Sequence, residues 1–278
     1  MDLTENPIGI YEKALPPFSE WEEALEMTRE FGYDFLELSI DESEERLARL
    51  SWSAAKRKEL RRAIDRTGVP VRHLCLSAHR KVPFASSDSA TRDRAWEMMH
   101  RAMELCTELG VRILQTQGHD VYYEESTDET WQRYMEGLAI AAEMGREASV
   151  MIGLENADIA SVGSVEQAAA IIDEIGNPWF QMYPDIGNIV AHGYDLVSQL
   201  TRATRYAVAI HIKDARPGEF RRVPFGEGTV PFDSAFAAIR DMGYRGPFVI
   251  EMWNDGKRDG TPIAREALRW VRERMGTI

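Results

Sequence analysis

Short apolar segments alternate with longer segments of helical period along the whole chain. The short segments are rich in β-branched residues and have the length of single strands, whereas the longer ones repeat apolar residues every three or four positions. This alternation is typical of βα units around a parallel sheet. We predict eight strands, at Pro7–Glu12, Asp34–Ile40, Val71–Ser77, Val111–Gln117, Val150–Asn156, Phe180–Asp185, Ala207–Lys213 and Pro247–Trp253.

The ends of the predicted helices carry matching signals. Five helical segments end in a glycine just before the next strand, and glycine can adopt the left-handed conformation that stops a helix. Other helices begin after a serine or threonine that can accept a bond from a free backbone N–H. The expected stops are Gly32, Gly68, Gly110, Gly176 and Gly243, and the expected starts are Ser19, Ser126 or Thr127, and Ser164.

Eight βα units close most simply as a (β/α)8 TIM barrel of the α/β class. A doubly wound open sheet is the alternative, but no predicted strand is followed by a glycine-rich nucleotide motif. The 278 residues suit one barrel or two small domains. Because no interior segment has the composition of a linker, we expect a single domain over residues 1–278.

Charge and cysteine content narrow the function. The net charge of −13 argues against a nucleic-acid partner, which is held through arrays of basic side chains. Cys75 and Cys106 have no CxxC partner and are expected to be buried, reduced thiols of a cytoplasmic protein. No apolar segment approaches the length of a membrane span, and the acidic N-terminus is unlike a signal peptide.

Four metal-capable side chains stand at the carboxyl ends of four consecutive predicted strands. In a barrel, these strand ends converge on one mouth. One such acid is more often a helix cap or an ion-pair partner, but four at equivalent positions predict a metal site. Three carboxylates and one imidazole suit one divalent ion such as Mn²⁺, Zn²⁺, Mg²⁺ or Co²⁺. The predicted ligands are Glu155, Asp185, His211 and Glu251.

Two glutamates on opposite sides of a metal permit one particular reaction. A metal that chelates the carbonyl and neighbouring hydroxyl of a ketose acidifies the intervening C–H and stabilises a cis-enediolate. One glutamate can then remove the proton from one face while the other returns a proton to the opposite face. The predicted chemistry is epimerisation next to a ketone.

The sequence also resembles a known family over essentially the whole chain. The segments that carry the resemblance are GIYEKALP (9–16), CLSAHR (75–80), NPWFQMYPDIGN (177–188), VPFGEG (223–228) and IEMW (250–253). They resemble the L-ribulose-5-phosphate 3-epimerases, also described as L-xylulose-5-phosphate 3-epimerases. These belong to the xylose-isomerase-like barrels, together with ketohexose 3-epimerases and type IV endonucleases.

The resemblance implies a substrate and a role for each ligand. The substrate would be a small phosphorylated ketopentose, in a pathway that breaks down a sugar acid such as ascorbate. Glu155, Asp185, His211 and Glu251 would bind one divalent metal, and Glu155 and Glu251 would also be the two catalytic acid/base groups.

A phosphorylated substrate needs an anion site near the barrel mouth. Basic residues follow the third and seventh predicted strands, and the loops after the last strands of barrels commonly bind phosphate. We expect Lys213 and Arg216 to be the main contacts, because both lie close to His211 in sequence. The other candidates are His79, Arg80, Lys81, Arg221, Arg222 and the backbone N–H groups of Gly226 and Gly228.

Further residues can be placed at the mouth or away from it. Asn188 is a candidate hydroxyl contact, and Glu37 is either another or the partner of a neighbouring base. Trp253 is placed to shield the metal or to pack a loop. We expect His73, His100 and His192 to be packing or surface residues, and we do not expect His119 to line the mouth.

Three other functions stay open on the residues alone. An epimerase or isomerase of unphosphorylated ketoses would leave the basic loops without a ligand. A DNA-repair enzyme would need a histidine-rich cluster of several metals, and the chain has only six histidines. A sugar-binding module would need no paired glutamates. Because barrels of this kind often associate, we predict a homo-oligomer.

Overall fold

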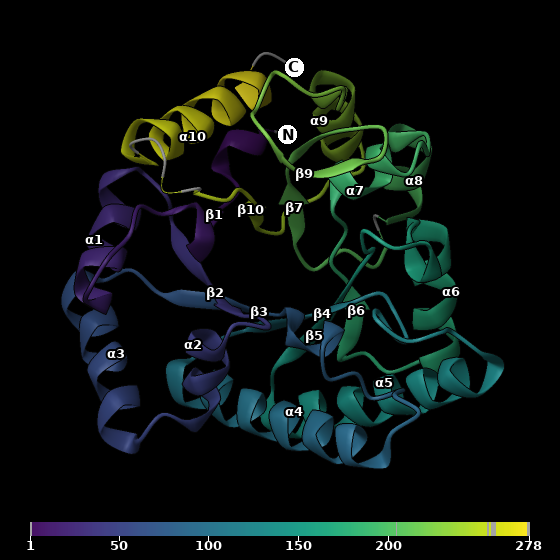
Figure 1. Cartoon of the computed structure of the whole chain (residues 1–278). Helices are drawn as coiled ribbons and strands as arrows, with labels where there is room; N and C mark the ends of the chain where they lie inside the picture. Colours follow the sequence, from purple (N-terminus) through teal and green to yellow (C-terminus); the bar gives the residue numbers. More distant parts are fainter. Residues whose placement is uncertain (1, 204, 255, 257–259, 277–278) are drawn as a thin grey trace.

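Eight parallel strands form the centre of the molecule. The structure is a computed structural model that describes residues 2–203, 205–254, 256 and 260–276. The strand order is β6-β5-β4-β3-β2-β1-β10-β7, and the bridges Met182–Ala207 and Asp185–His211 join the two ends of this order. Figure 1 looks along the barrel, with the helices arranged around it. The predicted barrel is confirmed, and the open doubly wound sheet is wrong.

Each observed strand lies within the range predicted for it. The strands are β1 (Ile8–Tyr11), β2 (Phe35–Ile40), β3 (Val71–Leu76), β4 (Ile113–Gln117), β5 (Met151–Glu155), β6 (Phe180–Met182), β7 (Ile210–Ile212) and β10 (Phe248–Ile250). A separate antiparallel hairpin of β8 (Asp214–Arg216) and β9 (Glu219–Val223) was not predicted. It follows β7 directly and therefore stands at the mouth of the barrel.

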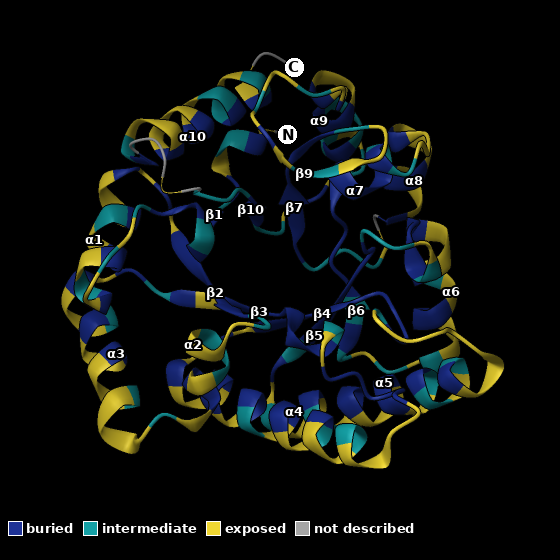
Figure 2. Cartoon of the chain, viewed as in Figure 1, coloured by how far each residue is buried: buried dark blue, intermediate teal, exposed yellow. Residues whose placement is uncertain are grey.

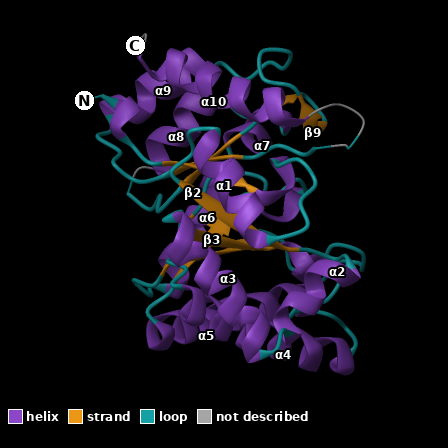
Figure 3. Cartoon of the chain, turned by 90° about the vertical axis from the view of Figure 1, so that its left-hand side faces the viewer, coloured by secondary structure: helices purple, strands orange, loops and turns teal. Residues whose placement is uncertain are grey.

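The helices form the outer layer. They are α1 (Trp21–Glu30), α2 (Glu44–Leu47), α3 (Ala54–Thr67), α4 (Ser89–Leu109), α5 (Asp128–Ala148), α6 (Val165–Ile175), α7 (Ile186–Ala191), α8 (Leu196–Ala203), α9 (Phe232–Asp241) and α10 (Gly260–Gly276). Short 3₁₀ turns are η1 (Leu3–Glu5), η2 (Glu12–Ala14), η3 (Ala48–Ser51), η4 (Ser77–Arg80) and η5 (Ala160–Val162). Figure 3 shows the strands enclosed by helices in the view turned by 90°. Among the described residues, no helix is both long and apolar enough to cross a membrane.

Most of the predicted helix ends are confirmed. All five predicted glycine stops have positive φ, with Gly68 and Gly176 directly capping α3 and α6. Thr127 and Ser164 begin α5 and α6 with capping boxes. Ser19 was wrong as a helix cap, because Glu20 precedes α1 without a side-chain cap bond.

Strand periodicity separates two apolar layers. Alternate residues of each strand point outward and pack with the helices in the main core. Figure 2 shows that the strands are mostly buried, whereas the outer helices carry exposed residues. The other residues point into the barrel, where a small apolar cluster fills the lower part. This inner cluster contains Tyr11, Phe35, Cys75, Ile113, Tyr183, Ala209 and Val249. Cys75 and Cys106 are both buried and unpaired, as predicted.

The inward positions become polar toward the carboxyl ends of the strands. Glu37 follows Phe35 by two residues in β2, and Gln115 follows Ile113 by two residues in β4. Both polar side chains are fully buried. Since residues two apart share one face of a strand, the same alternation that builds the apolar cluster directs the polar side chains to the mouth.

A substitution of Gly9 in β1 tests the packing of the inner cluster. A Cβ atom at this position would collide with the ring of Phe35, which is itself fully buried. We expect Gly9→Ala to lower the free energy of unfolding by about 1–3 kcal/mol, the usual cost of overpacking a core. Urea denaturation of the single variants and of Gly9→Ala/Phe35→Leu measures this effect. Losses that simply add in the double variant would show that the Phe35 contact is not the cause.

Candidate metal centre

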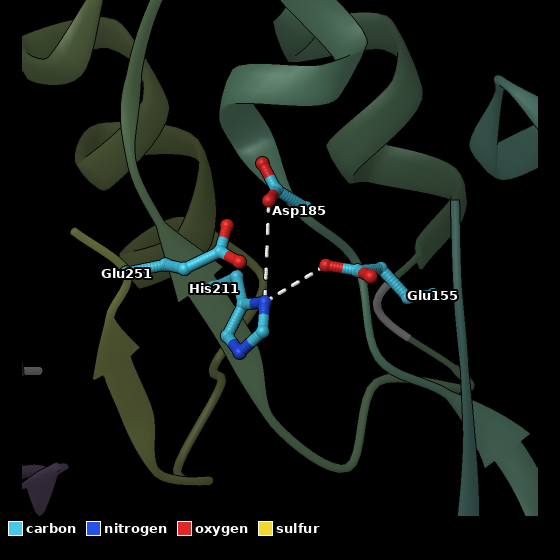
Figure 4. A group of neighbouring side chains, drawn as sticks. All are labelled: Glu155, Asp185, His211 and Glu251. Carbon is cyan, nitrogen blue, oxygen red and sulfur yellow. Dashed lines mark hydrogen bonds and ion pairs between the residues drawn. The ribbon is translucent and has the colours of Figure 1, made fainter. Parts of the chain in front are cut away.

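The four predicted metal ligands lie together inside the mouth of the barrel (Figure 4). Glu155 is the last residue of β5, and His211 lies in β7. Asp185 directly precedes α7, and Glu251 directly follows β10. One potential ligand atom from each side chain lies within 4.8 Å of the others, and all four residues are buried. The group could therefore hold a metal ion.

Asp185 is both a helix cap and a member of this group. Its Oδ1 accepts a hydrogen bond from the Asn188 backbone N–H at 2.9 Å, which begins α7. Its Oδ2 lies 3.9 Å from Nδ1 of His211. The Asn156 side chain accepts a bond from the Asp185 backbone N–H at 2.8 Å. One oxygen of the Asp185 carboxylate thus caps the helix, and the other faces the candidate metal ligands.

Two carboxylates fix the ring of His211. Nε2 lies 2.8 Å from Oε2 of Glu37, and Nδ1 lies 2.8 Å from Oε1 of Glu155. Burial alone would lower the pKa of His211, but Glu37, Glu155 and Glu251 together raise it well above its usual value. A carboxylate on one ring nitrogen leaves the other nitrogen directed at a metal. Glu37 was expected either to contact a substrate hydroxyl or to pair with a neighbouring base, and the structure shows it paired with His211.

The environment of Glu37 extends deeper into the barrel. The Tyr183 hydroxyl donates to Oε1 of Glu37 at 2.7 Å and lies 2.9 Å from Nδ1 of His73. His73 is thus a buried packing residue, as expected, although it also belongs to this polar network. Burial lowers the pKa of His73 well below its usual value. The network fixes Oε1 of Glu37, and Oε2 of Glu37 contacts His211.

Glu155 is held by two glutamines that the sequence interpretation missed. The side-chain amides of Gln115 and Gln117 both donate to its Oε2, the latter at 3.0 Å. Oε1 is left facing His211. The available signal was the alternation of the strand segment ILQTQ, whose two glutamines share one face with Ile113. Buried amides at such positions need polar partners, and Glu155 provides one.

Lys213 lies within the group rather than at a separate phosphate site. Its ammonium donates to Oε2 of Glu251 and Oδ1 of Asn188, both at 2.9 Å, and lies 2.7 Å from Oδ2 of Asp185. Burial would raise the pKa of Glu251, but Lys213 lowers it to about 2. For Asp185, burial outweighs Lys213 and raises the pKa to about 7. Lys213 therefore lies between Asp185 and Glu251 and contacts both carboxylates.

Asn188 connects Lys213 to the neighbouring strand. Besides accepting from Lys213, its amide donates to the backbone carbonyl of Asn156 at 2.8 Å. The side chain is buried, so both of its polar groups are used within the protein. A contact between Asn188 and a substrate hydroxyl stays a prediction.

The donor set suits a divalent cation. Glu37, Glu155, Asp185 and Glu251 are all buried, while Lys213 is the only lysine or arginine that contacts them in the described part of the chain. Even with His211 protonated and Asp185 neutral, three negative charges would face two positive ones. Buried charges are costly unless they are paired or bind a metal. A divalent ion would supply the missing charge, and oxygen with imidazole ligands is a usual donor set for Mn²⁺, Mg²⁺, Co²⁺ or Zn²⁺.

A large cavity, here called the mouth cavity, opens above the group. It has a volume of about 840 Å³, and its cationic lining residues are Lys13, Arg46, Arg49, Arg80, Arg221 and Arg222. A smaller cavity of about 100 Å³ is lined by Lys213 and Glu251. Trp253 and Arg222 line both cavities, so the two adjoin. The Trp253 ring lies 5.6 Å from the Lys213 ammonium, a position that covers this side of the group.

Several predicted phosphate contacts are occupied elsewhere. Arg216 donates to the Glu219 carboxylate at 3.0 Å and to the Glu227 backbone carbonyl at 2.8 Å. The backbone N–H groups of Gly226 and Gly228 both donate to Asp214 at 2.9 Å, so the expectation that they face a phosphate is wrong.

The candidate phosphate contacts that follow β3 lie in two different cavities. His79 packs against Phe84 with ring centroids 4.2 Å apart, in a small separate cavity that it shares with His119. Arg80 lines the mouth cavity, and its side chain lies 3.8 Å from Asp158. From the two predicted basic segments, the structure therefore brings Arg80, Arg221 and Arg222 to the mouth cavity.

Comparisons with known proteins agree with this fold. Residues 25–274 match the family model described as xylose isomerase-like TIM barrel. The L-ribulose-5-phosphate 3-epimerase UlaE of Escherichia coli O139:H28 (strain E24377A / ETEC) is 43% identical over 269 residues, which cover 97% of this chain and 95% of that relative.

Solved structures show the same fold at lower identity. A structure of L-ribulose 3-epimerase superposes with a TM-score of 0.81 at 21% identity, covering 98% of this chain and 95% of the other. The 3-keto-D-glucoside 4-epimerase YcjR of E. coli superposes with a TM-score of 0.79 at 20% identity, covering 97% and 100%. The chain therefore belongs to the L-ribulose-5-phosphate 3-epimerase family, whose members are isomerases, within the xylose isomerase-like TIM barrels.

Proposed function

We propose that this protein is a metal-dependent 3-epimerase that interconverts L-xylulose 5-phosphate and L-ribulose 5-phosphate through a cis-enediolate. The observation that carries the proposal is the convergence of Glu155, Asp185, His211 and Glu251 on one buried centre. The choice of substrate rests on the curated relatives, which are L-ribulose-5-phosphate 3-epimerases.

The four converging residues would hold one divalent ion, Mn²⁺, Zn²⁺, Mg²⁺ or Co²⁺. When bound, such an ion supplies Lewis-acid stabilisation of charge on the substrate oxygens. Glu37 would keep Nδ1 of His211 directed at the centre through its contact with Nε2.

Glu155 and Glu251 would exchange the proton at C3 from opposite faces of the substrate. They come from different strands, and separate partners hold them: Gln115 and Gln117 hold Glu155, while Lys213 holds Glu251. Each carboxylate would therefore keep its own orientation while the other changes its protonation state. Trp253 and the loops of the mouth cavity would limit access of water to the reacting carbon.

Charge at the mouth favours a phosphorylated substrate over a free ketose. Arg80, Arg221 and Arg222 line the mouth cavity on a chain whose net charge is −13. Local positive charge on an acidic protein attracts a small dianion. A DNA-repair role has less support, since the described residues contain one group of three or more metal-capable side chains and not several.

A cytoplasmic sugar-acid pathway, such as ascorbate breakdown, would suit this reaction. The buried, unpaired thiols of Cys75 and Cys106 support a reducing compartment. As in many barrels of this kind, we propose assembly into a homo-oligomer.

Proton NMR of metal-loaded protein in D₂O tests the reaction. L-xylulose 5-phosphate should exchange its C3 proton and yield L-ribulose 5-phosphate, whereas the unphosphorylated ketoses should react more slowly. Equal or faster reaction of the free sugars would favour the ketose alternative. No exchange with any of them, despite bound metal, would exclude the proposed epimerase.

Single Glu→Gln variants test the two-base mechanism separately from overall activity. Glu155→Gln and Glu251→Gln should each lower epimerisation by about 10²–10⁴-fold, the range expected for loss of an acid/base group. Each variant should still exchange the C3 proton of one epimer with D₂O, and the two variants should retain opposite epimers. This follows because each epimer presents its proton to only one glutamate.

The same NMR assay, run from both epimers, distinguishes this outcome from a one-base mechanism. In a one-base enzyme, one variant would lose exchange with both epimers and the other would keep both. Metal content measured on each purified variant controls for loss of the ion, and Glu219→Gln on the exposed hairpin serves as a matched substitution outside the site.

Glu37→Gln tests whether Glu37 acts through His211. Loss of the carboxylate on Nε2 should weaken metal affinity by about 10–100-fold, the usual effect of removing such a partner. Competition with a chelator measures the affinity. If Glu37 instead binds a substrate hydroxyl, the KM would rise at saturating metal while the metal affinity stayed unchanged.

A further inference from the structure

We infer that a directed chain of hydrogen bonds, from His73 through Tyr183 and Glu37, fixes the orientation of His211 and the nitrogen that carries its proton. Tyr183 is the central positioning residue of this chain. The inference rests on the proposed function, because it explains how the floor of the barrel acts on a residue proposed to hold the metal. The sequence gave His73 only a packing or surface role and did not single out Tyr183.

The chain consists of three contacts between buried side chains. Nδ1 of His73 lies 2.9 Å from the hydroxyl of Tyr183, and this hydroxyl donates to Oε1 of Glu37 at 2.7 Å. Oε2 of Glu37 lies 2.8 Å from Nε2 of His211. Three of the four side chains have no exposed surface, and His73 is only 2% exposed. Because bulk water hardly reaches these groups, each of them depends on its partner within the protein.

The number of protons on each group determines the direction of each hydrogen bond. A carboxylate only accepts, so the single hydroxyl proton of Tyr183 is used on Glu37. The hydroxyl oxygen can then only accept from His73, which places a proton on Nδ1 of that ring. By the same rule, Nε2 of His211 donates to Glu37. A neutral His211 would therefore present the lone pair of Nδ1 to the other candidate ligands.

Apolar packing fixes the hydroxyl on which the chain depends. Tyr183 belongs to the inner cluster, and its ring packs edge-on against His211 and His73, with centroids 4.6 Å and 5.7 Å away. A Cβ atom at Gly153 in β5 would lie 2.9 Å from Cδ2 of Tyr183, so the ring occupies the space that a side chain there would need. The inner cluster thus sets the position of the donor that orients Glu37.

No second donor is in place to replace this hydroxyl. Among the described residues, Tyr183 alone donates a hydrogen bond to Oε1 of Glu37. Nδ1 of His73 lies 3.8 Å from the same oxygen, beyond hydrogen-bond distance. Without the hydroxyl, Glu37 would have to rotate toward His73 to satisfy Oε1, and this rotation would disturb the contact of Oε2 with His211. Partners behind a metal ligand set its orientation and the metal affinity.

Tyr183→Phe tests the chain, because the substitution removes the hydroxyl and keeps the ring. Competition with a chelator should show a dissociation constant for Zn²⁺ that is about 3–10-fold higher, a smaller loss than for Glu37→Gln because the carboxylate remains. In the Glu37→Gln background, the same substitution should change the constant by less than about twofold, since the group through which Tyr183 acts is gone.

Tyr33→Phe is the matched control. Tyr33 is also buried, and its hydroxyl donates to the Ala264 backbone carbonyl at 2.8 Å, away from the candidate ligands. This variant should lose thermal stability as Tyr183→Phe does but keep the wild-type affinity for Zn²⁺. An unchanged affinity in Tyr183→Phe would overturn the inference, as would losses that simply add in the Tyr183→Phe/Glu37→Gln variant.

Nitrogen-15 NMR of the histidine side chains tests the direction of the chain in the Zn²⁺-loaded wild type, and so does not depend on whether a variant folds. The chain requires a proton on Nδ1 of His73 and a proton on Nε2 of His211. A ring that lacks its required proton would overturn the inference, whatever the variants show.

The wild type also separates this failure from failure of the proposed function. If the wild type binds no Zn²⁺, the proposed metal dependence is wrong, and the inference fails with it. If the wild type binds one ion per chain and epimerises L-ribulose 5-phosphate, while Tyr183→Phe binds Zn²⁺ equally well, only the role of Tyr183 is wrong.

Discussion

The excess of negative charge inside the barrel mouth is the constraint on which the site depends. Glu37, Glu155, Asp185 and Glu251 are removed from water, and burial of a carboxylate is unfavourable unless donors or cations surround it. Each of the four has its own donors: a tyrosine, a pair of glutamines, a helix N-terminus and a lysine. These partners orient the carboxylates, which is the preorganisation that the proposed proton transfer would require.

The period of the strands determines where these groups can occur. An inward position near the start of a strand packs against the inner cluster, as Phe35 does, whereas the inward position two residues later carries a charge, as Glu37 does. Apolar packing thus supports the polar layer from beneath. Gly9 belongs to this arrangement, since the Phe35 ring occupies the space that a side chain at position 9 would need.

Features encoded locally or by simple periodicity could be predicted from the sequence, and features that depend on the path of a loop could not. The strands follow from alternation, and the convergence of the four candidate ligands follows from their equivalent positions in successive βα units. Arg216 was predicted to be a main phosphate contact because it is near His211 in sequence. The unpredicted hairpin instead turns Arg216 toward Glu219. The glycines of PFGEG likewise resembled an anion-binding loop, yet their N–H groups bind Asp214, a carboxylate of the chain itself.

Two of the candidate metal ligands also take part in closing the barrel. Among the described residues, seven of the eight strand junctions are ladders of paired residues, whereas β6 and β7 are joined by two isolated bridges. One of these bridges is formed by Asp185 and His211, which are both candidate ligands. An ion held by this pair would also link the two strands at this junction. Local opening of the barrel wall and loss of the ion would then be a single coupled event.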